Sequence, residues 1–287
     1  MTQQILIESN VWQKLKNIES NCHRILRGAQ FEIPINPGRD VEILPIRELP
    51  PKRGLSFADG QGRLLHNLAS IELQAMELAI RTLSEFPEAP QQFREELAVV
   101  AIEEAKHLRL CVEALEEMRQ PWGSYPTHLG LWQCVSGEDS LIDRILIVHR
   151  YLEGSGLDAS DQLLRRLSGI KASNVSRVVS VIAHDEVGHV QFGSRWYKEI
   201  CKLRGIDPET DFRKRLFELL HRIPRRLDKI NSTLREKAGF SADEIVSLNE
   251  VREFWLAKPE ERIHSGPKNA TGLLSDSPTS GSQPEPV

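Results

Sequence analysis

Apolar residues recur every three or four positions through most of the chain beyond residue 61. This is the spacing of one buried face of an α-helix. It predicts four long helices, over residues 62–86, 90–118, from about 140 onward, and 173–203. Gly154 and Gly156 fall inside the third helix, where they favour a kink. The second and third helices are separated by a long connection, residues 119–139. Two helical hairpins joined by one long crossover form the ferritin-like version of a four-helix bundle. We therefore expect an all-α fold in which residues 61–206 form that bundle.

The segments on either side of the bundle have different patterns. Residues 1–60 contain an amphipathic helix, roughly Val11 to Leu26, followed by a proline-rich strap that proline keeps out of helical geometry. Residues 207–258 predict C-terminal helices packed on the bundle, at 212–221, 225–237 and 241–256. The last begins with a capping box, Ser241 to Glu244. Residues 259–287 are rich in proline, serine and glycine, which predicts a disordered tail.

Composition narrows the class of protein. The chain has 287 residues, of which 40% are hydrophobic and 27% charged, with a net charge of −4 and a pI near 6.2. Because the net charge is negative, the overall charge of the protein does not favour binding to nucleic acid. No apolar stretch approaches the length of a membrane span, and the N-terminus lacks a signal-peptide pattern, so we expect a cytoplasmic protein without a membrane partner. The four cysteines are widely spaced with no Cys-x-x-Cys, which favours buried thiols.

The most specific feature is a motif written twice. Glu104 and His107 form a Glu-x-x-His pair 32 residues after Glu72, and Glu186 and His189 form another 33 residues after Glu153, from the numbering (104 − 72 and 186 − 153). In a four-helix bundle, this pattern supplies six ligands to two metal ions, one carboxylate from each helix and an imidazole from two of them. The matched intervals make an internal duplication a hypothesis.

The chemistry of these residues fits a dinuclear centre. Residues three apart on a helix differ by about 60° around its axis, so the glutamate and histidine of each pair can bind one ion. Four carboxylates balance two divalent cations, and without metal they would repel one another and raise some of their pKa values. We expect two iron ions, with manganese as the alternative.

Other residues were weighed as ligands and set aside. Glu218-Leu-Leu-His221 lies on a basic, polar helix face, and Glu261-Arg-Ile-His264 adjoins the tail, so neither pair is expected to bind metal. Glu103 and Asp185 lie about 100° from a proposed ligand and are expected to face solvent or another helix.

Three more residues lie near the proposed ligands in the sequence. His149 precedes Glu153 by one turn of helix. Three roles are open for it: a hydrogen bond that supports Glu153, a further metal ligand, or simple core packing. His66 is expected to pack or to support the site from behind the ligands. Cys111, one turn beyond His107, is expected to be a small core residue.

Four segments resemble a bacterial family of ferritin-like proteins catalogued as a domain of unknown function: residues 66–79, 125–132, 152–158 and 185–197. That family is similar, more distantly, to the tRNA-hydroxylating diiron monooxygenases. The resemblance covers about residues 35–256, implies a ferritin-like fold, and places the metal ligands at Glu72, Glu104, His107, Glu153, Glu186 and His189. The chain departs from the family at Ser70, where relatives often have histidine.

The leading hypothesis for function is an O₂-activating diiron oxidoreductase, resembling a hydroxylase or monooxygenase, with an unknown substrate and an external electron donor. One alternative is a ferroxidase or iron-storage protein. Another is RNA binding or tRNA modification through the basic residues at 213–229, such as Arg213, Arg222 and Lys229. A homodimer is compatible with these hypotheses.

Overall fold

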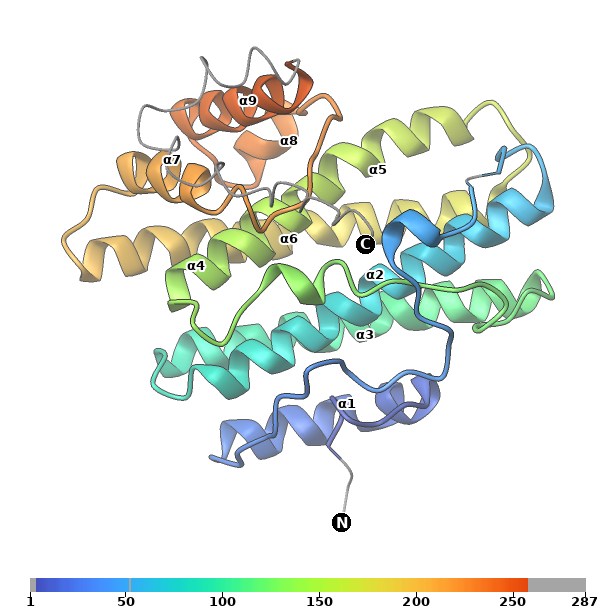
Figure 1. The fold of residues 1–287 in the computed structure, drawn as a ribbon, viewed down its shortest axis with the longest axis horizontal. Coiled ribbons are helices and arrows are strands. Elements are labelled where there is room, and N and C mark those ends of the chain that lie inside the picture. Colours follow the sequence, from blue (N-terminus) through green and yellow to red (C-terminus); the bar gives the residue numbers. More distant parts are fainter. Residues whose placement is uncertain (1–3, 52, 258–287) are drawn as a thin grey trace, which may run out of the picture.

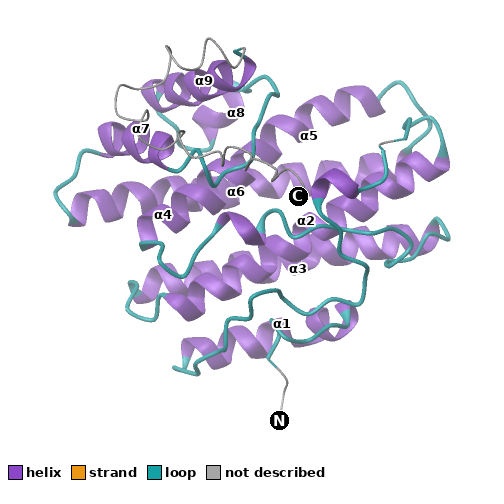
Figure 2. Ribbon diagram, viewed as in Figure 1, coloured by secondary structure: helices purple, strands orange, loops and turns teal. Residues whose placement is uncertain are grey.

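The computed structural model describes residues 4–51 and 53–257. Within these ranges the regular structure is helical apart from one isolated bridge between Ile43 and Thr127, as Figure 2 shows, so the predicted all-α class is confirmed. The elements in chain order are α1 (Val11–Leu26), η1 (Ile46–Glu48), α2 (Ala58–Glu85), α3 (Gln91–Glu117), η2 (Trp132–Cys134), α4 (Leu141–Ile145), η3 (Leu146–Leu152), α5 (Glu153–Leu167), α6 (Ser173–Leu203), α7 (Pro208–Glu218), α8 (Ser232–Lys237) and α9 (Ala242–Leu256).

The long helices form the middle of the molecule. Helix α2 packs along α3, α5 packs along α6, and α3 packs on α6. Helix α1 lies against α2 and α3 on one side, whereas α7, α8 and α9 lie on the other side, where α7 and α8 contact α6 (Figure 1). The buried apolar core runs through these layers, from Val11 in α1 to Val251 in α9. The interior between the two hairpins is therefore covered from both sides.

The third long helix consists of α4, η3 and α5 without an interruption. The junction residues Ile145, Leu146 and Glu153 all have helical dihedral angles. Between them, η3 has the wider π-helical turn, in which the amide of Glu153 donates to the carbonyl of Val148, five residues earlier. The irregularity expected at Gly154 and Gly156 is therefore a wide turn that ends just before the two glycines.

The crossover between the hairpins is fixed to α2 by a buried glutamine. The amide nitrogen of Gln74 donates to the carbonyl of His128, and its oxygen accepts from the backbone amides of Leu131 and Trp132. The strap joins the same connection through the bridge between Ile43 and Thr127. The loop that separates the hairpins in sequence is thus fully anchored.

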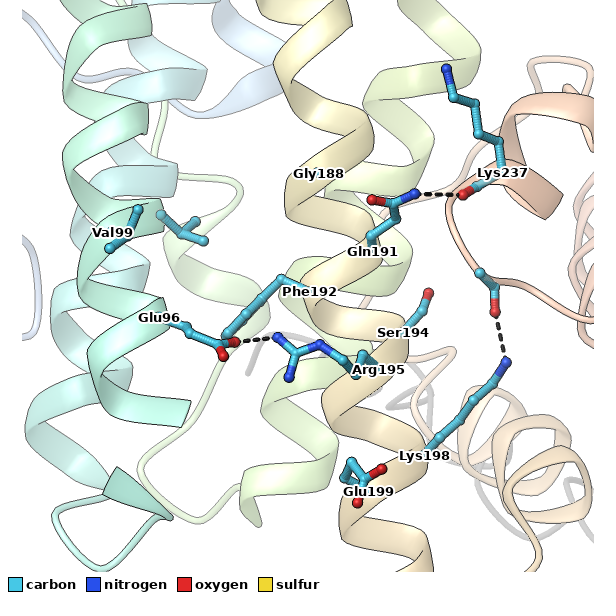
Figure 3. A pocket seen from close by; sticks show the side chains of 12 residues that line it. Glu96, Val99, Gly188, Gln191, Phe192, Ser194, Arg195, Lys198, Glu199 and Lys237 are labelled. Carbon is cyan, nitrogen blue, oxygen red and sulfur yellow. Dashed lines mark hydrogen bonds and ion pairs between the residues drawn. The ribbon is translucent and has the colours of Figure 1, made fainter. Parts of the chain in front are cut away.

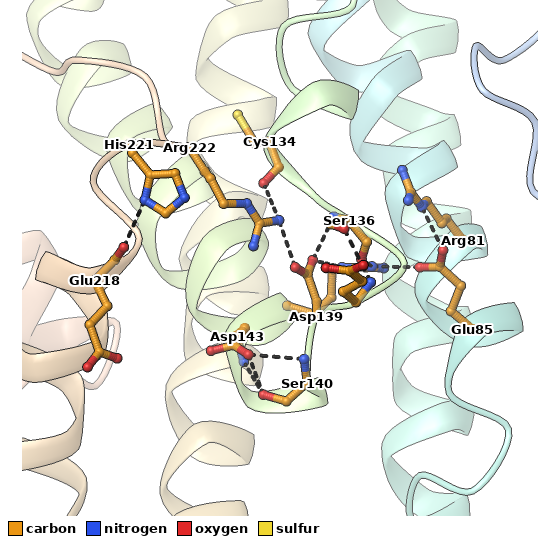
Figure 4. A network of polar contacts seen from close by, with 12 residues as sticks. Arg81, Glu85, Cys134, Ser136, Asp139, Ser140, Asp143, Glu218, His221 and Arg222 are labelled. Carbon is orange, nitrogen blue, oxygen red and sulfur yellow. Dashed lines mark hydrogen bonds and ion pairs between the residues drawn. The ribbon is translucent and has the colours of Figure 1, made fainter. Parts of the chain in front are cut away.

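A buried polar network holds the start of the third long helix (Figure 4). Arg144 donates to Asp139 at 3.1 Å and to Glu85 of α2 at 2.6 Å, while Arg222 pairs with Asp139 at 2.7 Å. Ser140 and Asp143 form a capping box at the N-terminus of α4. The network ties α2, the crossover and the C-terminal helices to one position, which sets the register of the third helix.

The C-terminal helices differ from the predicted ranges. Asp207 caps α7, so this helix begins before residue 212. The prediction of a helix over 225–237 was wrong for its first half, because the chain is non-helical there and α8 begins only after the cap residue Asn231. The predicted capping box of α9 is present, with Ser241 accepting from the Glu244 amide. The predicted tail, 259–287, and the pair Glu261 and His264 lie outside the described residues.

Candidate metal centre

The two Glu-x-x-His pairs meet between α3 and α6. Each of Glu104, His107, Glu186 and His189 offers a potential ligand atom, and these four atoms lie within 4.8 Å of one another. All four side chains are buried. Because α3 and α6 belong to different hairpins, these residues meet only when the hairpins pack face to face. The described part of the chain therefore contains a buried Glu/His cluster that could hold a metal ion.

The two lone glutamates face the same cluster. Glu72 of α2 places Oε2 3.5 Å from Nδ1 of His107 and is only 3% exposed. Glu153, the first residue of α5, is 9% exposed, and its charge acts on Glu186. Of the six sequence-predicted residues, four thus form the cluster, Glu72 contacts it through His107, and Glu153 is linked to it only through its effect on Glu186.

Several polar atoms of the cluster have no hydrogen-bond partner. Among them are both carboxylate oxygens of Glu104, one oxygen each of Glu153 and Glu186, and Nδ1 of both His107 and His189. The Nδ1 atom of His189 is 2.9 Å from Glu104, within ion-pair range but without hydrogen-bond geometry. A buried polar atom without a partner is costly, and a cation would satisfy these atoms together. The set of oxygen and imidazole donors suits iron or manganese.

The charges in the cluster oppose one another strongly. Burial, together with the nearby charges of Glu104 and Glu186, raises the pKa of Glu72 well above its usual value. Burial and Glu104 raise the pKa of Glu186 to about 7. Burial disfavours the charged form of His107, but Glu104 and Glu72 outweigh it and raise its pKa to about 11. The pKa values of Glu72 and Glu186 thus move in the direction expected of crowded carboxylates, whereas His189 and His107 hold the pKa of Glu104 below its usual range.

The outer nitrogen of each histidine contacts a carboxylate on the opposite helix. Nε2 of His189 on α6 lies 3.0 Å from Glu103 on α3, and Nε2 of His107 on α3 lies 3.3 Å from Asp185 on α6. Each carboxylate fixes the orientation of a ring whose Nδ1 atom faces the cluster. From the sequence, Glu103 and Asp185 are expected to face solvent or another helix, but their crossed contacts with the two histidines are not predicted. The signal was present, because an acidic residue directly precedes the glutamate of both pairs.

His149 supports Glu153 directly. Its Nδ1 atom lies 2.8 Å from Oε1 of Glu153, and both residues are buried. The ring packs edge-on against Phe192, and Gly193 of α6 leaves room for its Cβ atom, since a Cβ at Gly193 would lie only 2.4 Å away. The structure thus shows His149 in contact with Glu153, while its Nε2 atom is buried without a hydrogen-bond partner.

Other nearby residues belong to the packing. His66 stacks on Trp122 with ring centroids 4.6 Å apart, and its Nε2 accepts a hydrogen bond from the Gly123 amide. Burial lowers the pKa of His66 to about 4. Ser70 is buried and contacts Gln74. Cys111 is buried, and burial raises the pKa of its thiol. His66 and Cys111 therefore have the packing roles expected of them.

A groove of about 740 Å³ lies on the outer face of α3 and α6, next to Glu103 and His189 in sequence (Figure 3). Its apolar wall includes Val100 and Phe192, and the ring of Phe192 also contacts His149. Two of the charged side chains around it are engaged with protein atoms. Arg195 pairs with Glu96, and Lys198 donates to the carbonyl of Gly239. Phe192 thus links the wall of the groove to His149, which contacts Glu153.

The pair Glu218 and His221, set aside in the sequence, is not part of the cluster. Glu218 and His221 are exposed, and the His221 ring contacts the backbone carbonyl of Glu218, as the prediction requires. Several arginines of the basic segment are paired: Arg213 with Glu250, Arg215 with Asp143 and Asp211, and Arg222 with Asp139. Much of the positive charge at 213–229 is thus neutralised within the protein. Among the helices of residues 4–51 and 53–257, none combines the length and the apolar character that a bilayer crossing requires.

Fold and cluster define a class: an all-helical protein with a buried Glu/His site that could hold metal. The chain belongs to the family described as "Protein of unknown function (DUF455)", whose model matches residues 3–246. It is also 32% identical over 213 residues to an uncharacterized protein of Haemophilus influenzae (strain ATCC 51907 / DSM 11121 / KW20 / Rd), covering 71% of this chain and 73% of that protein. No solved structure matches the chain.

Proposed function

We propose that the cluster is a dinuclear metal centre with Glu72, Glu104, His107, Glu153, Glu186 and His189 as ligands. The observation that carries the proposal is the convergence of buried, unpartnered carboxylate oxygens and imidazole nitrogens from helices of both hairpins. Four carboxylates balance the charge of two divalent ions, and the crossed contacts of Glu103 and Asp185 hold both imidazoles ready for ligation. Iron is the proposed metal, with manganese as the alternative.

The proposed reaction class is an O₂-dependent oxidation, such as hydroxylation of an organic substrate. Two bound iron ions would supply the electrons and the Lewis acidity for reducing dioxygen. The protein's contribution is a buried site between α3 and α6, in a bundle that is flanked by α1 and by the C-terminal helices. The sequence contains no flavin or dinucleotide motif, so an external donor would restore the reduced state.

The proposal includes a ferritin-like bundle over residues 61–206, in which two helical hairpins are joined by one long crossover. A distant relationship to the tRNA-hydroxylating diiron monooxygenases is part of the proposal and rests on the four resembling segments. RNA binding ranks below oxidation, because the internal ion pairs of Arg213, Arg215 and Arg222 leave less charge for phosphate. Iron storage also ranks below it, because the strap and the C-terminal helices cover bundle faces that a thin-walled shell would need.

The test is metal binding by the purified chain. We expect about two iron ions per chain after anaerobic loading, and loss of stoichiometric binding in Glu104→Ala. Glu218→Ala is the matched control, because it alters an exposed Glu-x-x-His pair outside the cluster. An iron-loaded and fully active Glu104→Ala variant would refute the assignment. Large iron excess held in a hollow multimer would instead favour storage.

A further inference from the structure

The outer side of η3 is held by the C-terminal helices through buried arginines. The Arg150 guanidinium donates two hydrogen bonds of 2.7 Å to Glu244 of α9. The backbone carbonyl of the same residue accepts from Nη1 of Arg235 in α8 at 3.0 Å. Arg150 and Glu244 are fully buried, and Arg235 is 2% exposed. Both ends of Arg150 are therefore fixed by residues outside the long helices.

The carbonyl contact falls where the helix changes its hydrogen-bond spacing. The Glu153 amide still donates five residues back, to Val148, whereas α5 beyond it has ordinary α-helical spacing. A helix that returns from five-residue to four-residue spacing skips one carbonyl acceptor, which by this register is the carbonyl of His149, and Arg150 carries the next carbonyl along the helix. Arg235 supplies a donor to the Arg150 carbonyl at this point. The C-terminal unit therefore contacts the backbone of the wide turn at the carbonyl that directly follows the skipped one.

A glycine makes this approach possible. A Cβ atom at Gly154 would lie only 2.0 Å from Nη1 of Arg235, so any larger residue would displace the guanidinium. Asp158, one turn further along α5, holds the same guanidinium through Nη2 at 2.7 Å and Nε at 3.2 Å. By contrast, a Cβ at Gly156 would meet nothing within 4 Å. The chain thus offers a natural control two residues away.

We propose that Arg235 is a positioning residue for the candidate metal centre, acting through the Arg150 carbonyl to hold the wide turn of η3 and so to place Glu153. Each residue turns a helix by about 100°, so a wide turn that moved or closed would rotate Glu153 away from the cluster. His149, inside η3, would move with it and lose its bond to Glu153. The inference rests on the proposed function, because it needs Glu153 as a ligand.

The experiment compares Mn²⁺ binding by the wild type, Gly154→Ala, Gly156→Ala and Arg235→Met in the full chain. We expect two ions per chain in the wild type. In Gly154→Ala and Arg235→Met the second ion should bind about 10-fold to 100-fold more weakly, the usual effect of removing support behind a ligand. Gly156→Ala should bind as the wild type does. Combining Gly154→Ala with Arg235→Met should add little to either, because both remove the same contact.

A spectroscopic signature separates positioning from general loosening. Electron paramagnetic resonance should show coupled Mn²⁺ pairs in the wild type and in Gly156→Ala, and isolated ions in Gly154→Ala at the same loading. Arg215→Met is a further control, because it removes the contact with Asp143 without touching η3. Arg235→Lys keeps a donor for the Arg150 carbonyl and should recover part of the Mn²⁺ affinity that Arg235→Met loses. If Gly154→Ala does not fold, the comparison of Arg235→Lys with Arg235→Met still tests the proposal.

The outcomes distinguish the two claims. If the wild type binds no metal, the proposed function fails and the inference fails with it. If the wild type binds a coupled pair, and Gly154→Ala and Arg235→Met bind it equally well, the proposed function stands and the positioning role is overturned. An equal loss in Arg215→Met would likewise overturn the role, because a loosened C-terminal unit would then explain the effect.

Discussion

Replacing Glu244 with glutamine should destabilise the protein strongly, because it leaves the buried Arg150 guanidinium without a counter-charge. Arg150 enters a box of three rings, with its guanidinium carbon 4.9 Å from the Tyr197 centroid, 4.5 Å from Phe212 and 4.3 Å from Phe240. Water does not reach the pair, since both side chains are fully buried. The carboxylate of Glu244 is therefore the charge partner that Arg150 has in this box.

The magnitude follows from breaking a buried ion pair on one side. Removing one partner of such a pair costs about 3–5 kcal/mol, chiefly through the uncompensated charge that remains. For a chain of this size, each kcal/mol lowers Tm by roughly 2–4 °C, so Glu244→Gln should lower Tm by about 6–20 °C. Replacing both Arg150 and Glu244 with methionine should recover much of that loss, because no charge is then left buried.

Thermal unfolding followed by circular dichroism measures this effect, with metal removed by chelation so that ligation does not contribute. Glu244→Met, Arg150→Met and the double methionine variant form a double-mutant cycle that isolates the coupling between the two residues. A Glu244→Gln variant with a Tm within about 2 °C of the wild type would refute the reasoning, as that is less than 1 kcal/mol for a buried pair. A double variant less stable than either single variant would refute the charge argument.

Three further predictions follow from single sites. Burial lowers the pKa of His66 to about 4 from an ordinary 6.5, so the folded state disfavours protonation of this ring. Its contribution to the free energy of unfolding, about 3 kcal/mol, should be present above pH 6.5 and lost as pH falls to 4. Urea titrations should show that stability depends less on pH in His66→Gln, and an unchanged pH dependence would contradict this. Gly193→Ala should lower the free energy of unfolding by about 1–3 kcal/mol, because the added methyl group would overpack against η3. Gly188→Ala should be neutral or stabilising, because a Cβ atom there meets nothing within 4 Å. Equal stabilities of the two variants in chemical denaturation would contradict the close-contact explanation. Metal at about 100 times its Kd should raise Tm by roughly 5–10 °C. Scanning calorimetry should show that Glu104→Gln loses this rise, whereas the control Glu218→Gln keeps it. A rise retained in Glu104→Gln would contradict a role for Glu104 as a metal ligand.

The sequence predicted the long helices well, because their apolar faces and stop signals are local. The predicted bounds of α6, 173–203, agree with the structure, as do those of α1. The helix expected over 225–237 was wrong because tertiary contacts decide its start. The amide of Asn231 donates to the buried Asp158 of α5, and the Asn231 side chain then caps α8. Nothing within 225–231 indicates that distant partner.

At the candidate centre, spacing predicted which residues meet but not what supports them. The pairs at 104/107 and 186/189 were found because the motif is local and repeated. The crossed contacts of Glu103 and Asp185 require knowing that α3 and α6 lie side by side. The wide turn of η3 was expected only as a kink at Gly154 and Gly156, because the pattern of apolar residues does not show a change of hydrogen-bond spacing or the contact from α8 beside it.

The most direct test of the central claim is metal analysis of the chain purified without oxygen and loaded with Fe²⁺, followed by its optical spectrum on exposure to O₂. The proposal predicts about two irons per chain, bound at the six buried residues, and a spectral change that requires oxygen. A chain that binds no iron above background under these conditions would contradict it, because the buried, unpartnered oxygens and nitrogens of the cluster would then need another explanation.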